Sequence, residues 1–182
     1  MILGFDISTS ITGVSVLDYD GNIVLQEAII LNTKGKKRSL YEKADLVVEK
    51  IKKIKEKYNI EHVFIEDRLI NVDNKRKNTK VLAMLVEFNG MISWNCYNLF
   101  KQEPIHLHPS SVRSLAGFKK NTSSKDNVKI QVVNFLLDKY NKKFIVEYKR
   151  TGSYKDHIYD IADSIMVSLA GLKTLKKKSI LK

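Results

Sequence analysis

Four carboxylates of this 182-residue chain lie in segments whose other side chains are almost all apolar. They are Asp6, Glu66, Asp160 and Asp163. The last two are the only charges between residues 158 and 172, a segment that otherwise reads as a buried helix. Burying an ionised carboxylate costs several kcal/mol unless it is paired or coordinates a metal. The fold must therefore gather these acids where cations neutralise them, which favours a metal-dependent nuclease.

The composition supports a single folded domain with a polyanionic partner. Hydrophobic residues make up 43% of the chain, enough for a core, and 32 Lys and Arg against 20 Asp and Glu give a net charge of +12. Solubility, or a lysine bias of the genome, would explain the charge alone equally well. The lone Cys96 excludes an internal disulfide and a cysteine-based metal site. We find no membrane-spanning run and no signal peptide, and expect a cytoplasmic protein.

Hydrophobic periodicity predicts an alternation of strands and helices. The expected strands cover residues 2–7, 12–19, 22–31, 61–66 and 104–108. The expected helices cover residues 40–58, 77–95, a segment from a Ser123 or Ser124 cap to about 139, and 156–172, with a shorter helical turn capped by Ser110. Asp20-Gly21 indicates a tight hairpin, and Ser39 with Glu42 forms a capping box. This order predicts an α/β domain over residues 1–172, with a mixed sheet between helices and a frayed basic tail over 173–182.

The four acids suit hydrolysis of a phosphodiester. Two Mg²⁺ or Mn²⁺ ions about 4 Å apart activate water and stabilise the leaving oxygen, and such ions require oxygen ligands. We expect Asp6 to bridge the two ions, Glu66 to bind one, and Asp160 with Asp163 to bind the other. For any one acid a helix cap or a solvated loop end remains the alternative, most easily for Glu66.

Three motifs in this order resemble those of RuvC-type Holliday junction resolvases, within the RNase H-like superfamily. They are Phe5-Asp6-Ile7-Ser8, Ile65-Glu66-Asp67 and His157-Ile158-Tyr159-Asp160-Ile161-Ala162-Asp163-Ser164. Residues 109–113 and 124–128 resemble the family's basic loop and lysine-bearing helix. The resemblance implies an RNase H-like mixed five-stranded sheet flanked by helices on both faces. It also implies a homodimer that binds four-way DNA junctions and nicks opposed strands with Mg²⁺ or Mn²⁺. The compact, Lys- and Asn-rich chain suggests a phage or viral homologue, acting in the host cytoplasm.

Two further residues are candidates for catalysis. Lys125 resembles the family's phosphate-contacting lysine, and an ordinary solvated lysine is the alternative. His157 is either a metal ligand or water-orienting base beside Asp160, or a solvent-facing histidine in the first turn of its helix. We interpret His106 and His108 as structural, because no third zinc ligand is near them. Cellular family members carry a junction-opening aromatic after the strand glutamate, where this chain has Leu69 and Ile70.

Basic clusters mark the expected DNA interface. The predicted contacts are Lys75, Arg76, Lys77, Arg113, Lys119, Lys120, Lys125, Lys149 and Arg150, with Lys34, Lys36, Lys37, Arg38 and Lys155 in neighbouring clusters. Tyr148, Tyr154 and Phe118 either stack on bases or complete the core.

Other functions remain open on sequence alone. A nuclease acting on flaps or RNA–DNA hybrids would use the same acids, and a silent branched-DNA-binding module would keep only the fold. An actin-like ATP-handling domain would match residues 6–10 but needs a Gly-rich phosphate loop and a longer chain. The apolar helix around Leu82 to Trp94 is either the dimer interface or a buried core helix.

Overall fold

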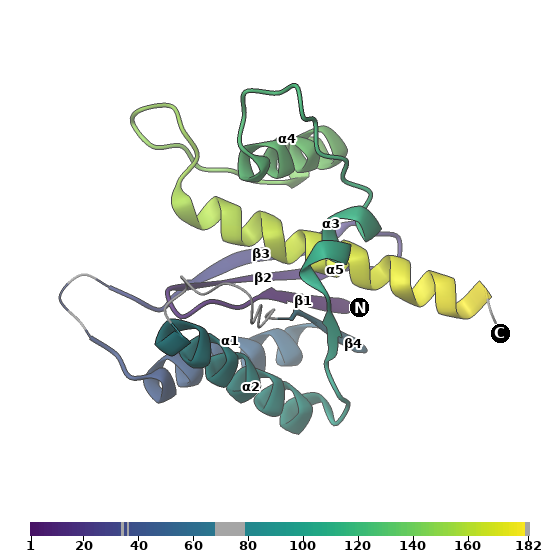
Figure 1. Ribbon diagram of the computed structural model, residues 1–182. Coiled ribbons are helices and arrows are strands. Elements are labelled where there is room, and N and C mark those ends of the chain that lie inside the picture. The colour runs from purple at the N-terminus through teal and green to yellow at the C-terminus, as the bar shows by residue number, and fades with distance from the viewer. Residues whose placement is uncertain (34, 36, 68–78, 181–182) are drawn as a thin grey trace.

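The computed structural model describes residues 1–180 except 34, 36 and 68–78. This part of the chain contains five strands and five α-helices, beginning with three strands and ending with three α-helices (Figure 1). The strands are β1 (Ile2–Asp6), β2 (Ile11–Leu17), β3 (Ile23–Ile30), β4 (His62–Glu66) and β5 (Ile105–Leu107). The helices are α1 (Leu40–Lys57), α2 (Thr79–Phe100), α3 (Pro109–Leu115), α4 (Val128–Tyr140) and α5 (Asp156–Ile180), with a short 3-10 helix at Asn141–Lys143.

The strands form one mixed sheet in the order β3-β2-β1-β4-β5. β1, β2 and β3 are an antiparallel meander, whereas β1, β4 and β5 run parallel. This arrangement confirms the predicted five-stranded α/β fold with helices on both faces.

Two local sequence signals are confirmed. Gly21 adopts a φ of 87°, which favours glycine, and its amide donates to the Asp18 carbonyl to close the β2–β3 turn. At the start of α1, the Ser39 amide donates to Glu42 Oε2 at 2.7 Å and the Glu42 amide donates to Ser39 Oγ at 3.2 Å. This capping box satisfies two amides that the helix leaves unpaired.

The sheet separates two hydrophobic cores, one under α1 and α2 and one under α3, α4 and α5. α5 crosses the second face close to the strands (Figure 1). Small residues permit this approach, since a Cβ on Gly4 would lie 2.1 Å from Ser168 Oγ. Ser15 Oγ and Ser168 Oγ are 2.7 Å apart in the same buried contact. These contacts fix the position of α5 over β1 and β2.

Several boundaries differ from the predictions. The N-cap of α4 is Asn127, whose side chain accepts from the Ile130 amide, and not Ser123 or Ser124. α3 begins at Pro109 after His108, so Ser110 lies inside it, and α2 continues to Phe100. α5 extends to Ile180 through most of the predicted tail, because Leu172 and Leu175 still pack on the core.

No helix in the described part of the chain is long and apolar enough to cross a membrane.

Candidate active site

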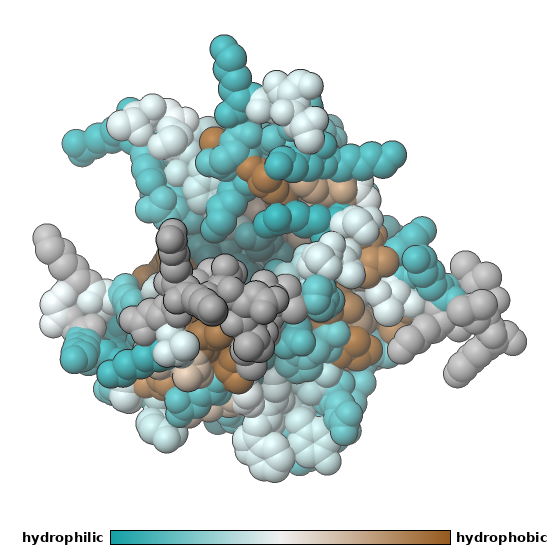
Figure 2. Space-filling model, in the orientation of Figure 1, coloured by the Kyte–Doolittle hydropathy of each residue, from teal (hydrophilic) through white to brown (hydrophobic). Residues whose placement is uncertain are grey.

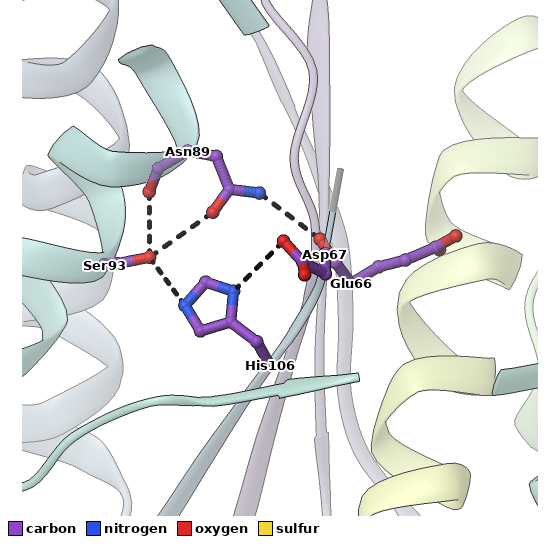
Figure 3. A network of polar contacts seen from close by, with 5 residues as sticks. All are labelled: Glu66, Asp67, Asn89, Ser93 and His106. Atoms are coloured by element: carbon purple, nitrogen blue, oxygen red, sulfur yellow. Dashed lines mark hydrogen bonds and ion pairs between the residues drawn. The ribbon is translucent and has the colours of Figure 1, made fainter. Parts of the chain in front are cut away.

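Asp6 and Glu66 lie at the same edge of the sheet. β1 and β4 are parallel neighbours with Phe5 opposite Ile65, so the next residue of each strand is an acid at its carboxyl end. Phe5 and Ile65 are buried on the α1–α2 side. Because side chains alternate along a strand, Asp6 and Glu66 face the α5 side. Figure 3 shows the Glu66 side chain pointing toward α5.

The packing of α5 on β2 carries Asp160 to this edge. Gly13 is the β2 partner of Asp6, and a Cβ on Gly13 would lie only 1.9 Å from the Asp160 carbonyl oxygen. The first turns of α5 therefore lie directly over the end of β1 and the start of β2. Asp163 follows on the same helix and is mostly buried, with 16% of its side chain exposed.

The electrostatics show that three of the acids interact. The pKa of Asp160 rises from its ordinary 3.8 to about 6, chiefly because of burial and then because of the negative charge of Asp6. Asp163 raises this pKa further, whereas the ammonium group of Lys129 opposes the rise. Asp6, Asp160 and Asp163 thus form a region of excess negative charge at the sheet edge.

A polar network braces the end of β4 from the opposite side (Figure 3). The side-chain Nδ2 of Asn89 donates to the Glu66 main-chain carbonyl oxygen at 3.3 Å, and the Ser93 hydroxyl donates to the Asn89 main-chain carbonyl oxygen at 2.9 Å. Ser93 Oγ also lies 3.1 Å from His106 Nε2, and His106 Nδ1 is 3.9 Å from Asp67 Oδ1. These contacts connect His106 to the end of β4 through Asp67, Ser93 and Asn89.

Two basic side chains lie near the acids. Arg113 Nη2 is 3.8 Å from Asp163 Oδ1, which places this predicted DNA contact at the acidic region itself. Lys129, in the first turn of α4, is the lysine that acts on Asp160. Lys125 is exposed in the loop before α4. Sequence reasoning missed Lys129 because it started this helix about four residues too early; the Asn127 cap was the available signal.

His157 faces a different neighbour. Its Nε2 is 3.4 Å from Glu147 Oε1, and both line a cavity of about 390 Å³ against β3. The structure therefore brings Asp6, Asp160 and Asp163 together but gives His157 a separate partner.

Four of the remaining predicted DNA contacts lie on the surface of the described part of the chain. Lys119, Lys120, Lys149 and Arg150 are exposed, and Lys149 Nζ donates to Asp156 Oδ1 at 2.6 Å. Hydrophilic side chains border a recess between the α4 region and the α1–α2 layer (Figure 2). Residues of the other clusters lie outside the described residues, namely Lys34, Lys36, Lys75, Arg76 and Lys77, as do Leu69 and Ile70.

The four acids supply only oxygen donors. Carboxylate oxygens suit Mg²⁺ or Mn²⁺, and the raised pKa of Asp160 shows negative charge that a cation would neutralise. Among the described residues, however, no group of three or more His, Cys, Asp or Glu side chains is arranged to hold a metal ion. The chemistry of the donors fits such cations.

This electrostatic arrangement predicts that metal-free Asp160→Asn is more stable than the wild type near neutral pH. Folding raises the pKa of Asp160, so below about pH 4 this carboxyl is protonated in both the folded and the unfolded state and does not lower the free energy of unfolding. As the pH rises through about 6, its ionisation in the folded state lowers the free energy of unfolding. Asparagine does not ionise and escapes that loss. We expect a gain of about 1–2 kcal/mol, reduced from the full shift by solvent screening. Thermal unfolding in EDTA should give Asp160→Asn a higher Tm than the wild type near neutral pH and nearly the same Tm near pH 4. An equal gain in Tm at both pH values would contradict ionisation of Asp160 as the cause.

Comparison with known proteins identifies the fold. No protein-family model matches the sequence, and no curated protein matches it in sequence. Solved structures do match over nearly the whole chain. Thermus thermophilus RuvC in complex with a Holliday junction substrate aligns with a TM-score of 0.63 at 14% identity, covering 97% of this chain and 94% of that one. The yeast mitochondrial Holliday junction resolvase Ydc2 aligns with a TM-score of 0.63 at 16% identity, covering 98% and 80%. The chain therefore has a RuvC-like fold of the RNase H type.

Proposed function

We propose that this protein is a metal-dependent, structure-selective endonuclease that nicks four-way DNA junctions. The observation that carries the proposal is the meeting of Asp6, Asp160 and Asp163 at the sheet edge of a RuvC-like fold. Glu66 points toward the same helix and completes the acidic set. The likeness to two Holliday junction resolvases supports the choice of substrate.

In this proposal Asp6, Glu66, Asp160 and Asp163 hold two Mg²⁺ or Mn²⁺ ions. The ions, when bound, supply a nucleophilic water and stabilise the leaving oxygen. The protein contributes the position of the acids, fixed by β1, β4 and the Gly13 contact with α5. Lys129 and Arg113 place positive charge beside them, where a phosphate would enter.

Branched DNA is the proposed partner. The net charge of +12 and the exposed Lys119, Lys120, Lys149 and Arg150 supply contacts to the phosphate backbone. Such contacts predict binding that weakens steeply with salt, because each neutralised phosphate releases counterions.

The test is cleavage of end-labelled four-way, Y-shaped, RNA–DNA hybrid and plain duplex substrates with Mg²⁺ or with EDTA. Paired symmetric nicks in the four-way junction that require Mg²⁺ are expected. Cleavage of flaps or hybrids instead would support metal-dependent hydrolysis but contradict the four-way junction as the substrate. Junction binding without cleavage in Mg²⁺ or Mn²⁺ would show that the protein binds branched DNA but is not a nuclease.

The proposal includes a homodimer that docks through α2. One side of this helix is buried at Phe88, Ile92 and Cys96, but its other side exposes large apolar residues. Trp94 is 63% exposed and stacks on Tyr97 with ring centroids 5.9 Å apart. An exposed stacked aromatic pair is typical of an interface anchor.

Trp94→Glu is therefore expected to convert a dimer to a monomer. The substitution places a charge where the partner helix would exclude water. Light scattering should give the mass of two chains for the wild type and of one chain for the variant. Tyr41→Glu is the matched control, because Tyr41 is an aromatic residue 68% exposed on α1. A wild type that is monomeric with and without DNA would contradict the dimer.

A further inference from the structure

A hydrogen-bonded hairpin precedes the acid-bearing helix α5. The Lys149 amide donates to the Ser153 carbonyl at 2.7 Å, and the Lys155 amide donates to the Glu147 carbonyl at 2.9 Å. Gly152 closes the tip with a φ of 83°. The hairpin, residues 147–155, projects from the body beside α4 (Figure 1, yellow-green loop). Its backbone hydrogen bonds hold it as a fixed element.

Three tyrosines connect this hairpin to the acidic region. The rings of Tyr148 and Tyr154 have centroids 5.2 Å apart with an interplanar angle of 32°. Tyr154 contacts Tyr159 edge to face at 6.2 Å, and Tyr159 directly precedes Asp160. The Tyr154 hydroxyl donates to Asn134 Oδ1 at 2.9 Å, which turns the tyrosine side of the hairpin toward α4. Tyr148 thus lies two ring contacts from the residue that precedes Asp160.

Tyr148 is not part of the hydrophobic core. It is 54% exposed, whereas the structural tyrosine Tyr140 is 8% exposed and donates its hydroxyl to the Gly21 carbonyl. An exposed ring supported on one side by a second ring presents a ready surface for a flat ligand. The neighbouring tip residues Lys149 and Arg150 are exposed cations.

A cation also lies at the inner end of the tyrosine series. Lys129, on α4, has its Nζ 5.9 Å from the Tyr159 ring centroid. The series therefore runs between positive charge at the hairpin tip and positive charge beside the acids. A nucleic acid strand needs this combination, a stacking surface for its bases and cations for its phosphates.

We propose that Tyr148 is a stacking platform for an unpaired nucleobase of the DNA substrate. The inference rests on the proposed function and deepens it, because a platform for unpaired bases would favour branched DNA over duplex. Tyr154 is a positioning residue that supports Tyr148 and ties it to α4. The ligand class is a single-stranded segment at a branch point, with its base on Tyr148 and its phosphates near Lys149, Arg150 and Lys129.

The test measures binding in an Asp160→Asn background, which blocks cleavage. Anisotropy of labelled four-way junction, single strand and duplex gives the three affinities. Tyr148→Ala should weaken junction and single-strand binding about tenfold, since base–aromatic stacking is worth that much or more. Duplex binding should not change, and Tyr148→Phe should bind like its parent because it keeps the ring. Tyr19→Ala is the matched control, an exposed tyrosine at the opposite end of the sheet from Asp6.

A second readout is the fluorescence of 2-aminopurine placed at the branch point. Stacking on Tyr148 should quench this base in the parent protein, and Tyr148→Ala should relieve the quenching. If the parent protein prefers branched DNA and Tyr148→Ala keeps the same affinities and quenching, the platform is wrong and the proposed function stands. If the parent protein binds duplex as tightly as branched and single-stranded DNA, the platform and the proposed junction selectivity both fall.

Discussion

The Asp160→Asn variant should bind four-way junctions at least as tightly as the wild type and cleave them more than about a hundredfold more slowly. Replacing a group that only supports a metal ligand already costs about 10–100-fold, and Asp160 is proposed as a ligand itself. Binding should survive because the substitution removes a negative charge from a site that receives phosphates. The raised pKa of Asp160 points the same way, since burial and the negative charges of Asp6 and Asp163 both act on this carboxylate.

Single-turnover cleavage of an end-labelled junction with Mg²⁺ would measure this loss. The matched control is Asp138→Asn, which removes an exposed carboxylate from α4 and should cleave at the wild-type rate. Asp6→Asn should behave like Asp160→Asn, because Asp6 is the acid whose negative charge raises the pKa of Asp160 most. A cleavage rate of Asp160→Asn within tenfold of the wild-type rate would show that this carboxylate takes no part in the reaction.

Much of the site could be predicted from the sequence because its acids interrupt apolar segments. A lone Asp6 in an apolar run requires a strand that ends at a polar edge, and the structure places it at the end of β1. Two acids three residues apart in an apolar stretch require a helix that carries both on one face, as α5 does. These inferences depend on strong local periodicity, which tertiary packing reinforced and did not override.

Contacts between distant segments could not be predicted in the same way. The helix of Lys129 was placed with the wrong cap, because Ser123, Ser124 and Asn127 are all good capping residues and only packing distinguishes them. The pairing of His157 with Glu147 depends on how the 144–148 segment folds back, and that segment has no regular periodicity. The end of α5 was underestimated because exposed lysines hide the contacts of Leu175 with the core.

The second large effect is expected at Gly13, where α5 packs very closely on the sheet. The property affected is the stability of the protein. In Gly13→Ala the new methyl group would lie 1.9 Å from the Asp160 carbonyl oxygen and 2.5 Å from its carbonyl carbon. Both atoms belong to the backbone of α5, so no side-chain rotation relieves the overlap, and helix and sheet must separate. Overpacking of a core typically costs 1–3 kcal/mol, and a backbone-to-backbone clash belongs at or beyond about 3 kcal/mol. For a chain of this length the Tm should fall by about 6–12 °C.

Gly90→Ala is the matched control for this effect. A Cβ there meets no atom within 4 Å, and Gly90 lies inside α2. Alanine in a helix is favoured over glycine by about 0.5–1 kcal/mol, so this variant should be slightly more stable than the wild type. Differential scanning calorimetry in EDTA compares the three proteins. In folded Gly13→Ala, Mg²⁺ should raise the Tm less than in the wild type, because Asp160 is displaced from Asp6. A Gly13→Ala protein as stable as the wild type would mean that α5 does not rest on β2 at this glycine, and the approach of Asp160 to Asp6 would lose its structural basis.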